Sequence, residues 1–257
     1  MQLYVCVKHV PDTAATIKVV GEAEFNDSAC KFIVNPYDEY ALEAAVQLYE
    51  KDKAGEVVVV TVGSEAALTT IRSVLAMGAT RAILIKHDGP FLNSKTTAAA
   101  LKAAILNDGQ PDLILGGKGA VDTEGFQTLY RLAAGMGLPM ANEVVKLDVT
   151  AGKATVEKEI GGGTRQVLEM GLPGVIGATK GLNKPRYPKF PDIMKAKKKE
   201  VNQIDLADLN LDTITNTSNV IKLEAVAERS AAKIMQGELR EQVLELVDTL
   251  KNQEKVL

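Results

Sequence analysis

The chain has 257 residues, of which 46% are hydrophobic, and it carries a formal net charge of −3 at pH 7. This length and apolar content can fill one α/β core, and the mildly acidic balance argues against general nucleic-acid binding. Because the sequence contains neither an apolar run of the roughly 18 to 20 residues that a membrane span needs nor a signal-peptide pattern, we expect a cytoplasmic protein without membrane insertion.

The first half of the chain alternates between buried strands and amphipathic helices. Apolar runs bounded by polar or glycine residues predict strands at 3–7, 56–62, 81–85 and 112–115. Apolar residues spaced three and four apart predict helices at 37–53, 64–77 and 94–107. This alternation is typical of a parallel sheet with crossover helices, so we expect an open, Rossmann-like nucleotide-binding fold.

The pattern changes after Met140. Residues 144–148, 154–160 and 164–170 read as antiparallel strands, because glycines 161–163 permit a tight reversal between the last two. A further strand at 175–178 is expected to return to the main sheet.

The C-terminal part is expected to be an arm. From Val201 the strand signals fade, which predicts an α/β domain over 1–200 and an extended arm over 201–257. The arm ends in a helix with an apolar face formed by Leu239, Val243, Leu246, Val247 and Leu250. That face has two possible roles, packing on its own domain or clasping a partner.

A nucleotide pocket is expected beyond the carboxyl ends of the strands. In an open parallel sheet, ligands collect where loops and helix starts place amide donors together. The glycine-rich stretch at 116–128 lies in such a loop, although it is neither a Walker loop nor a GxGxxG motif. On spacing alone, an ordinary glycine-rich turn is the favoured interpretation.

The sequence offers little for independent catalysis. His9 and His87 are the two histidines, and neither lies in a motif that suggests a catalytic triad. Cys6 and Cys30 lie in strand-like or apolar settings, which indicates buried thiols. No cluster has metal-ligand spacing. We therefore expect neither an enzyme nor a metal site.

The segment at 181–200 is built differently. Pro185, Pro188 and Pro191 fix the backbone and remove amide donors, which excludes a helix interior or a central strand. Lysines dominate its second half, so the segment is either a solvated surface loop or a basic surface for an acidic partner.

Five segments in order resemble the β subunit of electron-transfer flavoprotein. They are VKHVPDT (7–13), FIVNPYDEYALEAAVQL (32–48), VLAMGATRAI (74–83), GGKGAVDTEGFQT (116–128) and LNKPRYPKFPDIMKAKKK (182–199). Their order and spacing match the family across nearly the whole chain.

The resemblance implies an AMP site in this chain. Carried over by motif, it consists of Cys6, Asn35, Pro36, Tyr37, Asp38, Val62, Gly117, Asp122, Glu124, Gly125, Phe126, Gln127 and Thr128. Asp122 and Glu124 are expected to turn away from phosphate or to cap amides, because inward carboxylates would repel it.

Electron-bifurcating members of the family carry a second FAD in place of AMP and use NADH as donor. They have a loop resembling AIDGDTAQVGP, whereas this chain reads AVDTEGFQTLY, and its KAKKK block resembles the non-bifurcating group. Both features favour AMP. The loop also differs from the DDDCN type of mitochondrial proteins, so FAD stays open as an alternative.

The resemblance also implies partners. An α subunit would hold most of the reactive FAD, with Thr13 of this chain near it, and the C-terminal arm would clasp that subunit. The loop 183–191 would recognise an acyl-CoA dehydrogenase or similar flavoenzyme, with Phe190 as apolar anchor and a membrane quinone oxidoreductase as acceptor. The expected recognition residues are Arg186, Tyr187, Phe190, Ile193, Met194 and Lys195. An unrelated alternative is a stand-alone nucleotide-binding regulator.

Overall fold

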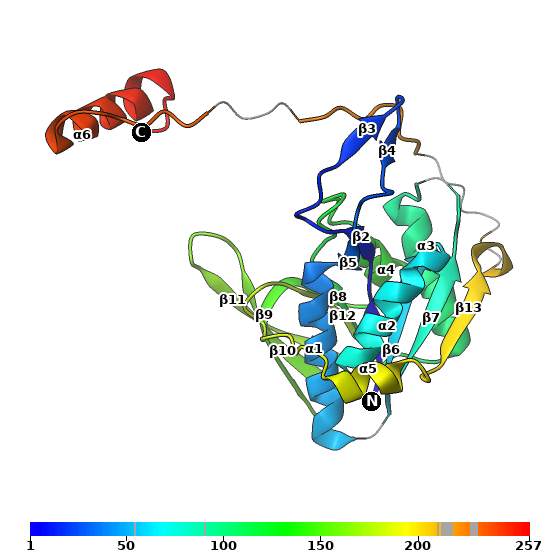
Figure 1. Ribbon diagram of the computed structural model, residues 1–257. Helices are drawn as coiled ribbons and strands as arrows, with labels where there is room; N and C mark the ends of the chain where they lie inside the picture. The colour runs from blue at the N-terminus through cyan, green and yellow to red at the C-terminus, as the bar shows by residue number, and fades with distance from the viewer. Residues whose placement is uncertain (54, 90, 210, 212–217, 227–230) are drawn as a thin grey trace. The chain divides into compact units, whose positions relative to one another are not determined.

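The computed structural model describes all residues except 54, 90, 210, 212–217 and 227–230. The chain forms two units, Met1–Leu223 and Glu224–Leu257. The first is built on a nine-stranded sheet in the order β11-β10-β9-β12-β8-β1-β6-β7-β13 (Figure 1). The prediction of an α/β fold on a largely parallel sheet is confirmed.

Six neighbouring strands of the sheet are parallel, and all but the edge strand Val201–Asp205 are largely buried. They are β1 (Gln2–Cys6), β6 (Glu56–Gly63), β7 (Arg81–Lys86), β8 (Leu113–Gly117), β12 (Gly174–Ala178) and β13 (Val201–Asp205). β1 lies between β6 and β8, so the chain leaves the first strand towards one side and later returns on the other. This reversal of strand order opens a crevice at the carboxyl end of β1.

Helices cover both faces of the sheet. They are α1 (Pro36–Asp52), η1 (Glu65–Ala67), α2 (Leu68–Met77), α3 (Ser94–Asp108) and α4 (Thr128–Met136). Successive side chains of a strand point to opposite faces of the sheet, and each face has its own core. Val57 and Val59 pack with α1 and α2, whereas Val58 and Val60 pack with α3 and α4. Each layer of helices therefore has its own apolar core.

A meander extends the sheet beyond β12. It consists of β9 (Met140–Thr150), β10 (Lys153–Glu159) and β11 (Arg165–Gly171), paired antiparallel in sequence, as the sequence predicts. Two small ribbons were not predicted: β2 (His9–Pro11) with β5 (Phe32–Val34), and β3 (Lys18–Val20) with β4 (Glu24–Asn26). Strands of three residues are too short to display an alternating pattern.

The segment after Val201 differs from the expected extended connector. Residues Val201–Asp205 form β13, which pairs in parallel with β7 at the sheet edge, and η2 (Leu206–Leu209) follows it. Leu209 is buried in the core beneath α3. Val201–Asp205 pairs along one edge only and leaves several side chains exposed, which explains its weak strand pattern. Residues 210 and 212–217 of the predicted connector lie outside the described residues.

The proline and lysine segment contains a short helix, α5 (Phe190–Ala196), that the sequence did not predict. Pro191 occupies its first turn, where a missing amide donor costs nothing. Upstream, Arg186 binds Glu43 (Nε to Oε2, 2.8 Å) and Glu50 (Nη1 to Oε1, 2.7 Å) on α1. The loop before α5 is thus fastened to the body of the protein.

Basic side chains fasten the other end of α5. Arg72 of α2 donates to the carbonyl oxygens of Ala196 (2.8 Å) and Lys199 (2.7 Å). Lys199 Nζ in turn donates to the carbonyl oxygens of Leu75 (2.8 Å) and Ala79 (2.6 Å) at the end of α2. Lys199 therefore caps a helix and does not belong to the exposed basic surface.

The second unit contains α6 (Leu239–Asp248) and the π-helical η3 (Thr249–Gln253). A capping box between Glu238 and Glu241 defines the start of α6. Its apolar side chains are exposed, including Leu239, Val243, Leu246 and Val247. No helix of the described residues is both long and apolar enough to serve as a membrane span.

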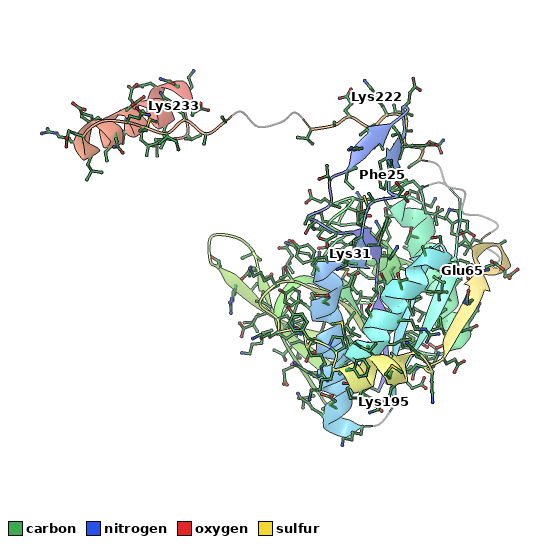
Figure 2. The ribbon with its side chains drawn as sticks, in the orientation of Figure 1. Phe25, Lys31, Glu65, Lys195, Lys222 and Lys233 are labelled. Atoms are coloured by element: carbon green, nitrogen blue, oxygen red, sulfur yellow. The ribbon has the colours of Figure 1, made fainter. Side chains whose placement is uncertain are left out.

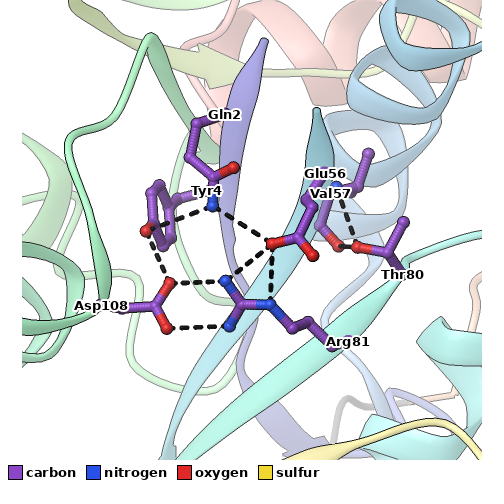
Figure 3. Close-up of polar contacts among 7 residues, drawn as sticks. All are labelled: Gln2, Tyr4, Glu56, Val57, Thr80, Arg81 and Asp108. Carbon is purple, nitrogen blue, oxygen red and sulfur yellow. Dashed lines mark hydrogen bonds and ion pairs between the residues drawn. The ribbon is translucent and has the colours of Figure 1, made fainter. Parts of the chain in front are cut away.

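At the amino ends of the strands, a polar network joins four elements (Figure 3). The Arg81 guanidinium on β7 binds both oxygens of Asp108 on α3 (each 2.8 Å), and its Nε donates to Glu56 on β6 (2.8 Å). The buried Tyr4 hydroxyl on β1 donates to Asp108 (2.7 Å). Burial raises the pKa of Tyr4 to about 12, so it stays a donor at neutral pH.

Arg81→Met is expected to lower the free energy of unfolding by about 2 kcal/mol, because two partly buried carboxylates lose their shared cation. Arg165→Met is the matched control, since Arg165 is exposed and lies 3.4 Å from Glu157; we expect a change within about 0.5 kcal/mol. Urea unfolding measures both. Equal effects would show that the network of Arg81 adds nothing to stability.

Candidate functional site

A cleft of about 560 Å³ lies beyond the carboxyl ends of β1, β6 and β8. These strand ends contribute Cys6, Val62, Gly63, Gly116 and Gly117. The loop before α4 closes one side and the segment before α3 another. The cleft is therefore in the crevice that the strand order creates.

The structure brings together most of the residues predicted for a nucleotide site. Those that line the cleft are Cys6, Asn35, Asp38, Val62, Gly117, Gly125, Phe126, Gln127 and Thr128. Pro36, Tyr37, Asp122 and Glu124 do not line it. Pro36 and Tyr37 begin α1 just behind the cleft, and their neighbours Asn35 and Asp38 face it.

Asn35 and Asp38 connect the loops around the cleft. Asp38 Oδ2 accepts the amide N–H of Lys8 (2.7 Å), and Oδ1 accepts that of Gly117 (2.8 Å). Asn35 donates from Nδ2 to the Gly119 carbonyl (2.9 Å) and accepts the Val121 amide at Oδ1 (3.1 Å). Both side chains are buried. Through them, two residues of one motif set the spacing between the loop at Lys8 and the loop at Gly117, which are more than 100 residues apart in the sequence.

Burial dominates the electrostatics at the base of the cleft. It raises the pKa of Asp38 to about 7, although the amides of Lys8 and Gly117 partly offset the effect. Burial and the neighbouring Asp38 raise the pKa of Cys6 to about 12. The Cys6 thiol therefore stays protonated and is no nucleophile at neutral pH.

The loop before α4 is shaped by two residues in the left-handed region, Glu124 (φ 45°) and Phe126 (φ 49°). The Phe126 ring folds over Gly119 and faces the cleft. Asp122 turns to Lys8, whose Nζ lies 2.8 Å and 2.6 Å from its two oxygens. Thr123, Phe126 and Gln127 of this loop therefore line the cleft, while Asp122 and Glu124 stay out of its lining.

Lys118 is a cleft residue that the sequence analysis missed. Its ammonium lies 5.3 Å from the Tyr37 ring centre, 5.8 Å from that of Phe126 and 3.6 Å from Glu143 Oε1. A cation held by two aromatic faces and one carboxylate is well placed to meet an anion entering the cleft. Its position directly after Gly117 in the glycine-rich loop is the signal that would have identified it.

The segment before α3 also lines the cleft and was not predicted. It contributes His87, Gly89, Phe91, Leu92 and Asn93, and the start of α3 adds Ser94 and Thr97. This segment follows β7, so the rule that strand ends gather ligands would have included it. Its residues add an apolar wall and a polar helix start.

His9 is outside the cleft. Its ring stacks on Phe32 with 4.5 Å between ring centres, and Nδ1 lies 2.7 Å from Thr70 Oγ1. Burial lowers the pKa of His9, so it is neutral at pH 7. The residues that the structure describes contain no His, Cys, Asp or Glu cluster able to hold a metal ion.

The expected recognition residues lie on and before α5. Phe190 is 75% exposed and Tyr187 91% exposed, and Ile193 and Met194 are also exposed. Lys195 projects from α5 (Figure 2), with its ammonium 3.8 Å from Asp192 Oδ1. Arg186 differs from the others, because its guanidinium is committed to Glu43 and Glu50. Thr13 is exposed in the turn after β2.

Gly117→Ala is expected to lower the free energy of unfolding by about 2 to 3 kcal/mol. A Cβ there would lie 2.5 Å from Asp38 Oδ1 and 2.5 Å from Tyr37 Cβ, so α1 would have to shift. Gly125→Ala is the control, because its Cβ would meet nothing within 4 Å. Thermal or urea unfolding compares them, and equal stability would contradict the close approach of β8 to α1.

Comparison with known proteins identifies the family. Residues 24–209 match the family model for the electron transfer flavoprotein domain. The electron transfer flavoprotein subunit beta of Bacillus subtilis (strain 168) is 36% identical over 260 residues and is covered in full, as is this chain. The chain belongs to the electron transfer flavoprotein β-subunit family.

Other members of the family are similarly related. The subunit beta of Syntrophomonas wolfei is 43% identical over 201 residues, which cover 78% of each chain. That of Mus musculus is 35% identical over 234 residues, with 90% of this chain and 91% of the relative covered. The resemblance drawn from five sequence segments is confirmed, and the cleft belongs to an electron transfer flavoprotein β subunit.

Proposed function

We propose that this chain pairs with an α subunit to form an electron transfer flavoprotein, binds AMP in its cleft and forms one wall of a flavin site. Membership of the family over the full length of the chain carries the proposal. An α subunit would hold most of the FAD, and this chain would have no catalytic residue of its own. The protein would thus be an electron carrier, with the chemistry supplied by the flavin.

The AMP assignment is supported by the form of the cleft. Its volume of about 560 Å³ is within the range typical of small-molecule sites. The amides at the start of α4, with Gln127 and Thr128, offer donors to a phosphate. Lys118 supplies a positive charge at the same loop. The predicted binding residues Pro36 and Tyr37 would act from behind the cleft, by orienting the start of α1.

The flavin and the α subunit would contact surfaces of this chain outside the cleft. Thr13, in the exposed turn after β2, would approach the isoalloxazine ring. The apolar face of α6 is suited to pack on another protein, since the described residues of its own unit leave it exposed. An arm of this kind would clasp the α subunit.

Electron donors would bind at α5. Phe190, Tyr187, Ile193 and Met194 are exposed apolar side chains on and before α5, and the exposed Lys195, which lies 3.8 Å from Asp192, adds positive charge to the same helix. An apolar anchor with a charged rim fits a transient complex with an acyl-CoA dehydrogenase or related flavoenzyme. The electrons would pass on to a membrane quinone oxidoreductase, in keeping with a cytoplasmic carrier.

The test is to express this chain with its α subunit and to mix the purified complex with an acyl-CoA dehydrogenase and its substrate. Bleaching of the flavin absorbance, dependent on dehydrogenase, supports the carrier role. Reduction by NADH with no dehydrogenase would instead favour the electron-bifurcating alternative. Purification of this chain as a stable monomer that never pairs would favour a stand-alone nucleotide-binding regulator.

A further inference from the structure

The start of α1 fixes the geometry of the cleft through one carboxylate. The two oxygens of Asp38 each accept a backbone amide, one from Lys8 after β1 and one from Gly117 at the end of β8. A carboxylate accepts at both oxygens, whereas an amide or a carboxylic acid presents a donor at one of them. Ionised Asp38 is therefore the form that bonds to both strand ends at once.

The charged groups around Asp38 compensate the negative charge of its carboxylate only in part. The charge of Lys8 lowers the pKa of Asp38, but its ammonium is engaged by Asp122. Lys118, on the β8 side, is directed towards Glu143. Cys6, at the end of β1, is a neutral thiol. Along α1 itself, Glu39 is the adjacent carboxyl group, and burial raises its pKa as well.

We propose that Asp38 is a positioning residue for the nucleotide: its ionised carboxylate holds the loops after β1 and β8 at the spacing that binding requires, and its protonation releases one of them. The role assumes the AMP site proposed above. Asp38 acts through the amides of Lys8 and Gly117, and its bonds to them are part of the floor of the cleft. The nucleotide affinity of the complex then depends on pH near neutrality.

The direction of the pH dependence follows from the burial of Asp38. Since burial raises the pKa of this group to about 7, it takes up a proton as the pH falls from 8 towards 6. In the protonated form one oxygen becomes a hydroxyl, which is a donor and only a weak acceptor, so one of the two buried N–H groups loses most of its hydrogen bond. A lost buried hydrogen bond of this kind lowers affinity by about tenfold.

The experiment measures AMP binding by calorimetry to the nucleotide-depleted heterodimer from pH 5.5 to 8.5. The comparison is between wild type and Asp38→Asn, which has nearly the same shape but accepts at only one atom. At pH 8.5 we expect wild type to bind about tenfold more tightly. At pH 5.5 the two affinities converge, because wild-type Asp38 is then protonated.

Comparing wild type with Asp38→Asn at each pH removes the effect of the titration of the AMP phosphate. The AMP phosphate has its own pKa of about 6, which affects both proteins alike, so it cancels in the ratio of affinities. Glu39→Gln is the matched control, since it removes the adjacent carboxyl group of α1, which is outside the cleft, and should keep the wild-type profile. If Asp38→Asn does not fold, the AMP affinity of wild type is measured alone against pH. The proposal then requires that this affinity change more with pH than the phosphate titration accounts for.

The outcomes separate the two proposals. A wild-type complex that binds AMP with the same affinity as Asp38→Asn at every pH overturns the role of Asp38 and leaves the AMP site standing. Tighter binding by Asp38→Asn at high pH also overturns it, because the carboxylate would then repel the nucleotide. A wild-type complex that binds no AMP at any pH overturns the AMP site, and the role of Asp38 with it.

Discussion

Replacing Phe190 by alanine is expected to raise the dehydrogenase concentration needed for half-maximal flavin reduction by about 30-fold. The ring is 75% exposed at the start of α5, so it contributes little to the stability of this chain and is available to a partner. An anchor that fills a pocket carries a large share of the energy of a transient interface. Stopped-flow reduction of the complex by a dehydrogenase measures the effect, and the flavin content should stay unchanged.

The control for Phe190→Ala is Leu106→Ala, which truncates a partly exposed apolar side chain on α3. We expect its reduction kinetics to match wild type. If Phe190→Ala also reduces at the wild-type rate across a range of dehydrogenase concentrations, α5 does not carry the anchor.

Removing the chain from Val226 onwards is expected to prevent stable pairing with the α subunit. The deleted unit holds the exposed apolar side chains of α6, and burying each of them on a partner contributes on the order of 1 to 2 kcal/mol. Size-exclusion chromatography of the co-expressed chains should show them eluting separately. The first unit has its own core, so this chain should still fold.

A point substitution makes the same test without deletion. Leu246→Ser places a polar group on the apolar face of α6 and should weaken the heterodimer by about tenfold or more, whereas Lys251→Ser on the following turn should not. An unaltered complex for both the truncated chain and Leu246→Ser would reject the clasping role of the arm.

The parallel sheet could be predicted from the sequence because its strands are buried on both faces. Runs such as Val57 to Val60 are apolar throughout, and helices with apolar spacing separate them. The edge segment Val201–Asp205 has two consecutive exposed polar residues, Asn202 and Gln203, so it lacks the alternation of a strand and was assigned to the arm. The helix α5 was hidden by prolines, although Pro191 at its first turn is compatible with a helix.

The lining of the cleft was predicted in part, and the limits have physical causes. Residues at strand ends, such as Cys6 and Gly117, follow from the topology and the family motifs. The roles of Asn35 and Asp38 do not, because hydrogen bonds to residues far along the chain appear only in three dimensions. In the same way, lysine content alone could not separate Lys195, which is exposed, from Lys199, which caps α2.

We propose that this β subunit holds AMP and shares one FAD with its partner. The most direct test is to denature the purified heterodimer and to quantify the released nucleotides by chromatography and mass spectrometry. We predict one AMP and one FAD per heterodimer. Two FAD and no AMP would contradict the claim and make the bifurcating function the leading one, and release of no flavin would contradict the carrier function itself.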